Sequence, residues 1–275
     1  MRLDSAAIGR FDFKDLFTEG RSLAGSEQSS NCCQMKAPAS TPTRPYHAVP
    51  IEDCGEPLVE LPSQIQRLEP HPYRALGADY QGRSPFQLRS GAVRRLERAQ
   101  LELQRLQPGW QLLIFDTYRP IAVQRFMVEY SYRQLLHARQ LDPEELSEQQ
   151  HQQLVDEVLA LWAWPSSNPA TPPPHSTGAA VDLSLVDGSG CEVEMGSPID
   201  ELSERSHPAH FEGSSDPDSQ RYHCHRQLLH QVMAIAGFQR HPKEWWHFSY
   251  GDQMWAWLSR REGRSEAIAI YGRVE

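Results

Sequence analysis

The sequence lacks an apolar run long enough to cross a membrane. A membrane-spanning helix needs about 20 mostly apolar residues, and charged residues interrupt each short apolar stretch in the first twenty positions. No signal-peptide core can be found there either. From these absences we expect a protein that works in the cytoplasm and has no membrane partner.

Paired cysteines are also missing. The five cysteines are odd in number and none forms a CxxC pair: Cys32, Cys33, Cys54, Cys191 and Cys224. This usage is typical of a reduced cytoplasmic chain and unlike a disulfide framework.

Positive charge is scarce as well, because the chain has 27 Lys and Arg against 36 Asp and Glu, which gives a net charge of -9. Nucleic-acid sites need clustered positive charge, so we expect a small substrate and no nucleic acid, with the oligomeric state open.

Large apolar residues are sparse near the N-terminus. Between Gly20 and Pro45 the chain is rich in Ser, Gly, Pro, Thr and Gln, and such composition rarely offsets the entropy lost on ordering. We therefore predict a flexible extension at residues 1–45. The remaining residues, 46–275, are predicted to form one catalytic domain.

Apolar spacing predicts the elements of that domain. Helical periodicity and end signals predict helices at residues 90–106, 121–138, 142–162 and 228–236. Compact or alternating apolar runs predict strands at residues 110–118, 179–187 and 245–250, and a turn at 187–190 predicts a hairpin with 191–195. Their order favours an α+β fold, a single domain with a central, mainly antiparallel sheet packed by helices.

A candidate metal pair lies at the start of the second predicted strand. His175 precedes Asp182 by seven positions, so a histidine from a loop can converge with a carboxylate on the polar face of the strand. One histidine near one aspartate is more often an ordinary capping or surface arrangement. Further residues must complete a site.

Glu244 and His247, in the EWWH segment, supply them. A catalytic zinc takes three protein ligands and keeps a fourth position for water, and His175, Asp182 and His247 make such a set. We therefore expect one zinc ion per chain, held at one edge of the sheet. Glu244 would act as general base toward the water that the metal activates. The alternative is a core strand with a buried histidine.

Together the motifs resemble those of the VanX-type D-alanyl-D-alanine dipeptidases and the wider group of zinc D,D-peptidases. The resemblance covers roughly residues 58–250, and its motifs are FDTYRP at 115–120, HSTGAAVDLSL at 175–185, VEMGSPID at 193–200 and EWWHF at 244–248. It implies the same three ligands and the same base. It also implies that Arg119 stabilises the oxyanion.

The resemblance extends to the substrate pocket, with two departures. Asp116 and Tyr118 end the same strand as Arg119, where they would line the pocket or orient Arg119. Pro173 stands where the family pattern has a serine, which removes a hydroxyl and a backbone donor. Glu194 replaces an aspartate, and its longer carboxylate would bind the substrate ammonium. Both departures leave the choice of dipeptide open.

The predicted function is zinc-dependent hydrolysis of a short D-amino-acid dipeptide, in the first place D-alanyl-D-alanine from peptidoglycan metabolism. One alternative is a D,D-carboxypeptidase that acts on peptidoglycan stem peptides through a more open cleft. A second is a non-catalytic zinc-binding module of the same fold. Glu244 and Arg119 argue against the second, because a structural zinc needs neither residue.

Overall fold

The computed structural model describes Met35 and residues 43–274. The predicted flexible extension, 1–45, therefore lies almost wholly outside the described residues, and its last residue, Pro45, already opens the short 3-10 helix η1 (Pro45–Ala48). Among the described residues, no helix has the length and apolar character to cross a membrane.

A five-stranded sheet forms the centre of the fold. Its strands run in the order β2 (Gln66–Arg67), β4 (Gln111–Asp116), β5 (Ala180–Val186), β7 (His247–Ser249) and β6 (Gln239–Arg240). Every neighbouring pair is antiparallel except β2 and β4. A second sheet pairs β1 (Leu58–Glu60) with β3 (Gln87–Arg89). The predicted α+β domain with a mainly antiparallel sheet is confirmed.

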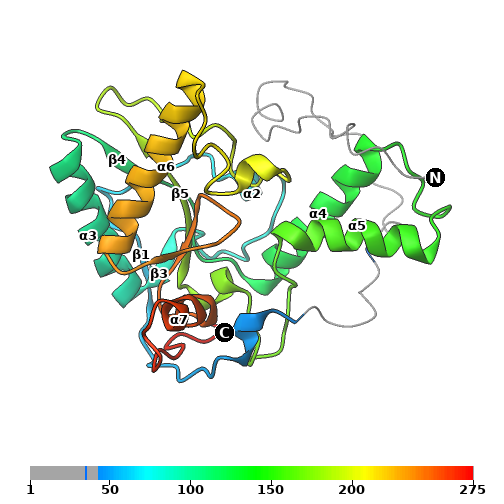
Figure 1. Ribbon diagram of the computed structural model, residues 1–275. Helices are drawn as coiled ribbons and strands as arrows, with labels where there is room; N and C mark the ends of the chain where they lie inside the picture. The colour runs from blue at the N-terminus through cyan, green and yellow to red at the C-terminus, as the bar shows by residue number, and fades with distance from the viewer. Residues whose placement is uncertain (1–34, 36–42, 275) are drawn as a thin grey trace.

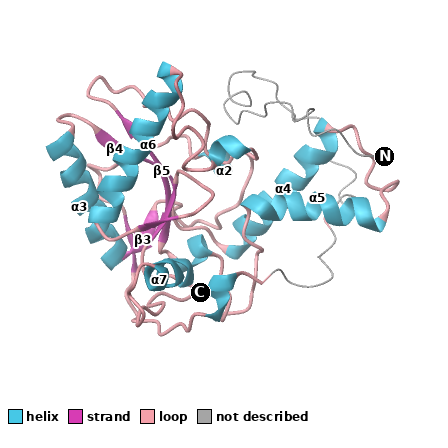
Figure 2. Cartoon of the chain, in the orientation of Figure 1, coloured by secondary structure: helices cyan, strands magenta, loops and turns pink. Residues whose placement is uncertain are grey.

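Helices pack on both sides of this sheet (Figure 1). They are α2 (Pro72–Ala75), α3 (Ser90–Leu106), α4 (Ile121–Ala138), α5 (Glu148–Leu161), α6 (Pro217–Ile235) and α7 (Gln253–Arg261), with 3-10 turns η2 (Pro174–Thr177) and η3 (Glu204–Ser206). Helices α3 and α6 pack side by side, whereas α4 and α5 pair on the other side of the strands (Figure 2). The predicted bounds of α3 and α4 are confirmed to the residue.

Three predicted elements are wrong in part. The helix expected at residues 228–236 begins already at Pro217, after Asp216, which caps it by accepting from Ser219 N. The helix expected from Asp142 begins only at Glu148. The Asp142 carboxylate accepts a hydrogen bond from Glu144 N at 2.9 Å, and Glu145 N donates to Asp142 O at 3.1 Å, but only this single turn forms there. Ser147 then caps α5 by accepting from Gln150 N. The turn at residues 187–190 forms, but the predicted second strand of the hairpin is reduced to one bridge, between Val186 and Glu192.

Strand β5 is the best-buried strand of the sheet, with all seven residues buried. Leu183 and Leu185 have no exposed surface and belong to the main core. Asp182 and Ser184 lie on the predicted polar face, yet they are only 2% and 1% exposed. This polar face is therefore covered by protein, as expected of a strand that supplies a site.

The strand register brings the chemical residues to the middle of the sheet. Asp182 on β5 pairs with Asp116 on β4 and with His247 on β7. These three are the inner strands, so the candidate ligands lie across the middle strands of the sheet, at the edge where β4 ends and β7 begins. A metal there would be shielded by the surrounding elements.

Gly178 lies in the loop between His175 and Asp182, and a substitution there tests how tightly this loop is packed. It has a φ of 70°, and a Cβ atom there would overlap Leu58 Cδ2. We expect Gly178→Ala to lower the free energy of unfolding by about 2–4 kcal/mol, from backbone strain and overlap together. Urea unfolding of the purified variants measures it.

Gly190→Ala is the matched control. Gly190 has a φ of 86° but nothing within 4 Å of a built Cβ, so it should suffer strain alone and lose only about 1 kcal/mol. Equal losses in the two variants would show that the Leu58 contact does not constrain this loop.

Candidate metal centre and active site

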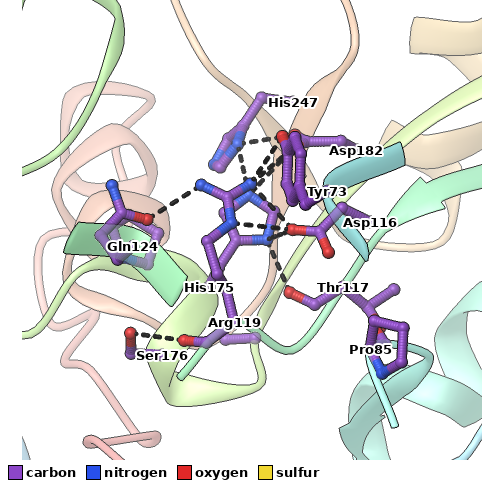
Figure 3. Close-up of polar contacts among 12 residues, drawn as sticks. Tyr73, Pro85, Asp116, Thr117, Arg119, Gln124, His175, Ser176, Asp182 and His247 are labelled. Carbon is purple, nitrogen blue, oxygen red and sulfur yellow. Dashed lines mark hydrogen bonds and ion pairs between the residues drawn. The ribbon is translucent and has the colours of Figure 1, made fainter. Parts of the chain in front are cut away.

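Three buried side chains converge at the candidate metal centre (Figure 3). His175 Nε2 lies 3.1 Å from Asp182 Oδ2, and His247 Nδ1 lies 3.0 Å from Asp182 Oδ1. The two histidine nitrogens are 3.2 Å apart. His175 comes from η2, Asp182 from β5 and His247 from the first residue of β7. The structure thus brings together the three ligands expected from the sequence.

The hydrogen bonds of His175 prepare it to bind a metal. Its Nδ1 lies 2.6 Å from the backbone oxygen of Thr117, and a carbonyl oxygen can only accept. The proton therefore sits on Nδ1, and the lone pair of Nε2 faces Asp182 and His247. A tetrahedral zinc with ligands at about 2.1 Å places them about 3.4 Å apart, close to the separations found. The three residues fit a metal ion, and they form a group that could hold one.

Ionisation also suits metal binding. Burial alone would raise the pKa of Asp182, but the contacts with His175 and His247 outweigh it and hold that pKa far below its ordinary value. Burial lowers the pKa of His247, although its hydrogen bond to Asp182 opposes this effect. An ionised carboxylate beside a neutral imidazole is the state in which these groups bind metals.

Arg119 places a fixed positive charge next to this group. Its guanidinium donates from Nε to Asp116 Oδ2 at 2.9 Å, from Nη1 to Gln124 Oε1 at 2.9 Å and from Nη2 to Asp182 Oδ2 at 3.3 Å. The Tyr73 ring lies 4.8 Å away. Arg119 is only 3% exposed, so its position is set on every side.

Asp116 orients Arg119 and is itself enclosed. It has no exposed surface, and His71 Nε2 and the Tyr80 hydroxyl each lie 3.1 Å from its Oδ1. Burial acts to raise its pKa, but Arg119 and His71 lower it below the ordinary value. Tyr118 points elsewhere, since its hydroxyl accepts a hydrogen bond from Arg83 at 3.0 Å. Of the two roles expected for Asp116, orienting Arg119 fits its contacts.

Glu244 lies beside the ligands, as expected of a base. Its Oε2 is 3.8 Å from His247 Nδ1, and its Oε1 is 3.2 Å from His241 Nδ1. Burial raises the pKa of Glu244 well above its ordinary value, and Asp182 and Asp200 add to the rise. A carboxyl group shifted in this direction can both accept and return a proton near neutral pH.

Glu194 does not lie at the site, contrary to the expectation. Its neighbours Val193 and Met195 are buried while Glu194 is exposed, because successive residues of extended chain face opposite sides. Its backbone oxygen accepts a hydrogen bond from His225 on α6 at 2.7 Å. The structure therefore places its carboxylate on the surface.

Asp200 supplies the buried carboxylate that sequence reasoning missed. It is 7% exposed, and its Oδ2 accepts a hydrogen bond from the Tyr73 hydroxyl at 2.7 Å. Its φ of 64° is unusual for a residue other than glycine, and such strain is often found at functional sites. The available signal was its place at the end of the VEMGSPID motif.

Tyr73 and His71 were missed as well, and the sequence carries no clear signal for them. Both lie at α2, which the sequence shows only as a proline-rich stretch. The Tyr73 hydroxyl accepts a hydrogen bond from Arg119 Nη2 at 3.1 Å, and the His71 ring packs edge-on against the Tyr73 ring. Their roles follow from folding and not from spacing.

Comparisons with known proteins show the family of this chain. The family Peptidase_M15, described as D-ala-D-ala dipeptidase, matches residues 66–262. The chain belongs to this family. A D-alanyl-D-alanine dipeptidase of Synechocystis sp. is 48% identical over 244 residues, which cover 86% of this chain and 98% of the relative.

Two further similar proteins match shorter stretches of this chain. The D-alanyl-D-alanine dipeptidase of Escherichia coli is 36% identical over 140 residues, 51% of this chain and 55% of the relative. A solved structure of the LdcB LD-carboxypeptidase aligns over 77% of this chain and 75% of that chain, with 14% identity and a TM-score of 0.39. So low a score carries no argument about function.

Asp200 makes the stability of the metal-free protein depend on pH. Burial, with a further contribution from Asp182, raises its pKa from 3.8 to about 7. Because the folded-state pKa is higher, the folded protein keeps a proton that the unfolded chain releases, and stability falls as pH rises from 3.8 to about 7. Asn cannot ionise. We expect Asp200→Asn, in EDTA, to be more stable than wild type at about pH 8.

Urea unfolding at a series of pH values measures this effect. The gain in stability of Asp200→Asn should shrink steadily as the pH falls and become constant below 3.8, where wild-type Asp200 becomes protonated in both states. A gain that stays constant with pH would show that ionisation of Asp200 is not its cause.

Proposed function

We propose that this Peptidase_M15 member is a zinc-dependent dipeptidase that hydrolyses D-alanyl-D-alanine. One observation carries the proposal: Glu244 and Arg119 both lie at the His175, Asp182 and His247 group, inside one buried site. The Synechocystis and Escherichia coli relatives, both D-alanyl-D-alanine dipeptidases, support the choice of substrate. Zinc is proposed because two imidazoles and one carboxylate form a typical catalytic zinc set.

The residues divide the chemistry between them. When bound, zinc would polarise the scissile carbonyl and lower the pKa of a water molecule. Glu244 accepts the proton of the attacking water, and its raised pKa lets it return that proton to the departing amine. Arg119, held by Asp116 and Gln124, stabilises the negative charge that develops on the carbonyl oxygen. His175 keeps its proton on Nδ1, at Thr117 O.

Asp200 is proposed to bind the substrate ammonium in place of Glu194. It is buried beside Tyr73 and forms no ion pair with a cation among the described residues. A buried carboxylate without a cationic partner is costly, and the free ammonium of a dipeptide would supply one. Pro173 provides no hydroxyl for this role, so Asp200 and Tyr73 carry it in this chain.

This carboxylate also separates the two enzyme hypotheses. In a peptidoglycan stem peptide, the residue before the scissile bond is acylated and has no ammonium, so Asp200 would stay unpaired. The dipeptidase is therefore favoured over the D,D-carboxypeptidase. A non-catalytic module would need neither Glu244 nor Arg119. The cytoplasmic location and the absence of a nucleic-acid partner stay predictions of the sequence.

A substrate panel tests the function. Zinc-loaded protein should release alanine from D-alanyl-D-alanine and release much less from L-alanyl-L-alanine or from a pentapeptide stem. Chromatography of the free amino acids measures each rate. Faster cleavage of the pentapeptide than of the dipeptide would favour the carboxypeptidase, and no cleavage of any substrate would leave only the binding module.

Two variants separate catalysis from metal binding. Glu244→Gln should keep about one zinc per chain and lose activity by about a hundredfold or more, because the base is lost while the ligands remain. His247→Ala should lose most of the bound zinc, because one of three ligands is removed. Elemental analysis after dialysis gives the zinc content. Full activity in Glu244→Gln would show that another residue is the base.

A further inference from the structure

We infer that Arg44 binds the terminal carboxylate of the dipeptide substrate. The inference rests on the proposed function and adds a binding residue to that same site. Arg44 lies upstream of residue 66, where the family match begins, so the motifs of the family do not include it. It immediately precedes η1, which is held firmly against the domain.

The segment that carries Arg44 is tied to α7 and to the C-terminal part of the chain. Gln253 Nε2 on α7 donates hydrogen bonds to the backbone oxygens of Val49 at 2.7 Å and His47 at 3.3 Å. Further along, Ala269 N donates to Pro50 O at 3.1 Å. These contacts give Arg44 a defined position relative to the sheet.

Arg44 faces the end of α5 and the loop that leads to His175. A narrow crevice there is lined by residues that include Arg44, Tyr46, Leu159, Trp164 and Pro173. The guanidinium donates a hydrogen bond to the backbone oxygen of Leu159. Pro173, in the same crevice, is two residues before the proposed ligand His175.

The same end of α5 also touches the catalytic cation. Trp162 lies 5.0 Å from the Arg119 guanidinium, and Ala163 O accepts from Gln124, which holds Arg119. Arg44 and Arg119 therefore flank one short segment, residues 159–163. The positive charge of Arg44 also acts on Glu244, where it opposes the rise in pKa that burial causes.

The two charges of a free dipeptide each need an oppositely charged partner in the site. A free dipeptide brings one ammonium and one carboxylate. Asp200 can take the ammonium, and Arg119, held by Asp116, Gln124, Tyr73 and Asp182, is already assigned to the carbonyl oxygen. Among the described residues, Arg44 forms no ion pair with a carboxylate, and its guanidinium donates one hydrogen bond, to the backbone oxygen of Leu159. It is the cation left to pair with the carboxylate.

Two charged anchors would explain selection for a dipeptide. The terminal carboxylate of D-alanyl-D-alanine lies within one residue, about 3.8 Å along the chain, of the scissile bond. Asp200 then binds the amino end of the dipeptide and Arg44 binds its carboxyl end. A guanidinium suits the second task because its paired N–H groups match both oxygens of a carboxylate.

The test compares D-alanyl-D-alanine with its C-terminal amide, which lacks the negative charge. In Arg44→Gln we expect KM for D-alanyl-D-alanine to rise about tenfold or more, because a charge-assisted hydrogen bond is lost. KM for the amide should change less than about twofold, and kcat for either should change little. Arg44→Lys keeps the charge without the paired geometry, and we expect it to recover part of the loss.

Arg125→Gln is the matched control, since Arg125 is an exposed arginine on the nearby helix α4 and lies outside the crevice. It should leave both KM values unchanged. If Arg44→Gln raises KM equally for the acid and the amide, or changes neither, the inference about Arg44 is wrong while the dipeptidase function stands. If wild-type protein cleaves neither compound, the proposed function fails together with it.

Discussion

The structure depends on a carboxylate buried in the middle of its sheet. Asp182 sits on the central strand β5 and is almost without solvent contact, a position in which an isolated charge would be strongly unfavourable. His175, His247 and Arg119 surround it, and each comes from a different element of the fold. The helices, loops and neighbouring strands must all be in place before this carboxylate is compensated, so the site and the fold form together.

Around Asp182, positively and negatively charged side chains alternate. Arg119 lies between Asp116 and Asp182, and Asp116 is held in turn by His71 and Tyr80. Because both carboxylates are held in place, the Arg119 guanidinium keeps one orientation, and the position of its charge is fixed before substrate binds. Preorganised charge of this kind stabilises a developing oxyanion without reorganisation at the moment of reaction.

The pKa values separate the carboxyl groups by task. The pKa of Asp182 is held low by its histidine contacts, whereas burial raises those of Glu244 and Asp200. A low pKa suits a metal ligand, and a raised pKa suits a group that exchanges protons. For Asp200, a bound ammonium would offset the burial that raises its pKa. Residues of the same chemical type thus acquire different functions from their surroundings alone.

Short motifs in the sequence were enough to predict the candidate ligands, Glu244 as base and, through the family resemblance, Arg119 as the cation of the site. Periodicity also determined α3, α4 and the central strands. The tertiary structure decided the rest. Asp142 caps only a single turn, whereas the helix begins after Ser147. Tyr73, His71 and Asp200 enter the site through contacts 45 to 127 residues apart in the chain, and no local pattern encodes such distances. Glu194 was excluded from the site by the alternation of a few extended residues, which turned its carboxylate to solvent and left the buried position to Asp200.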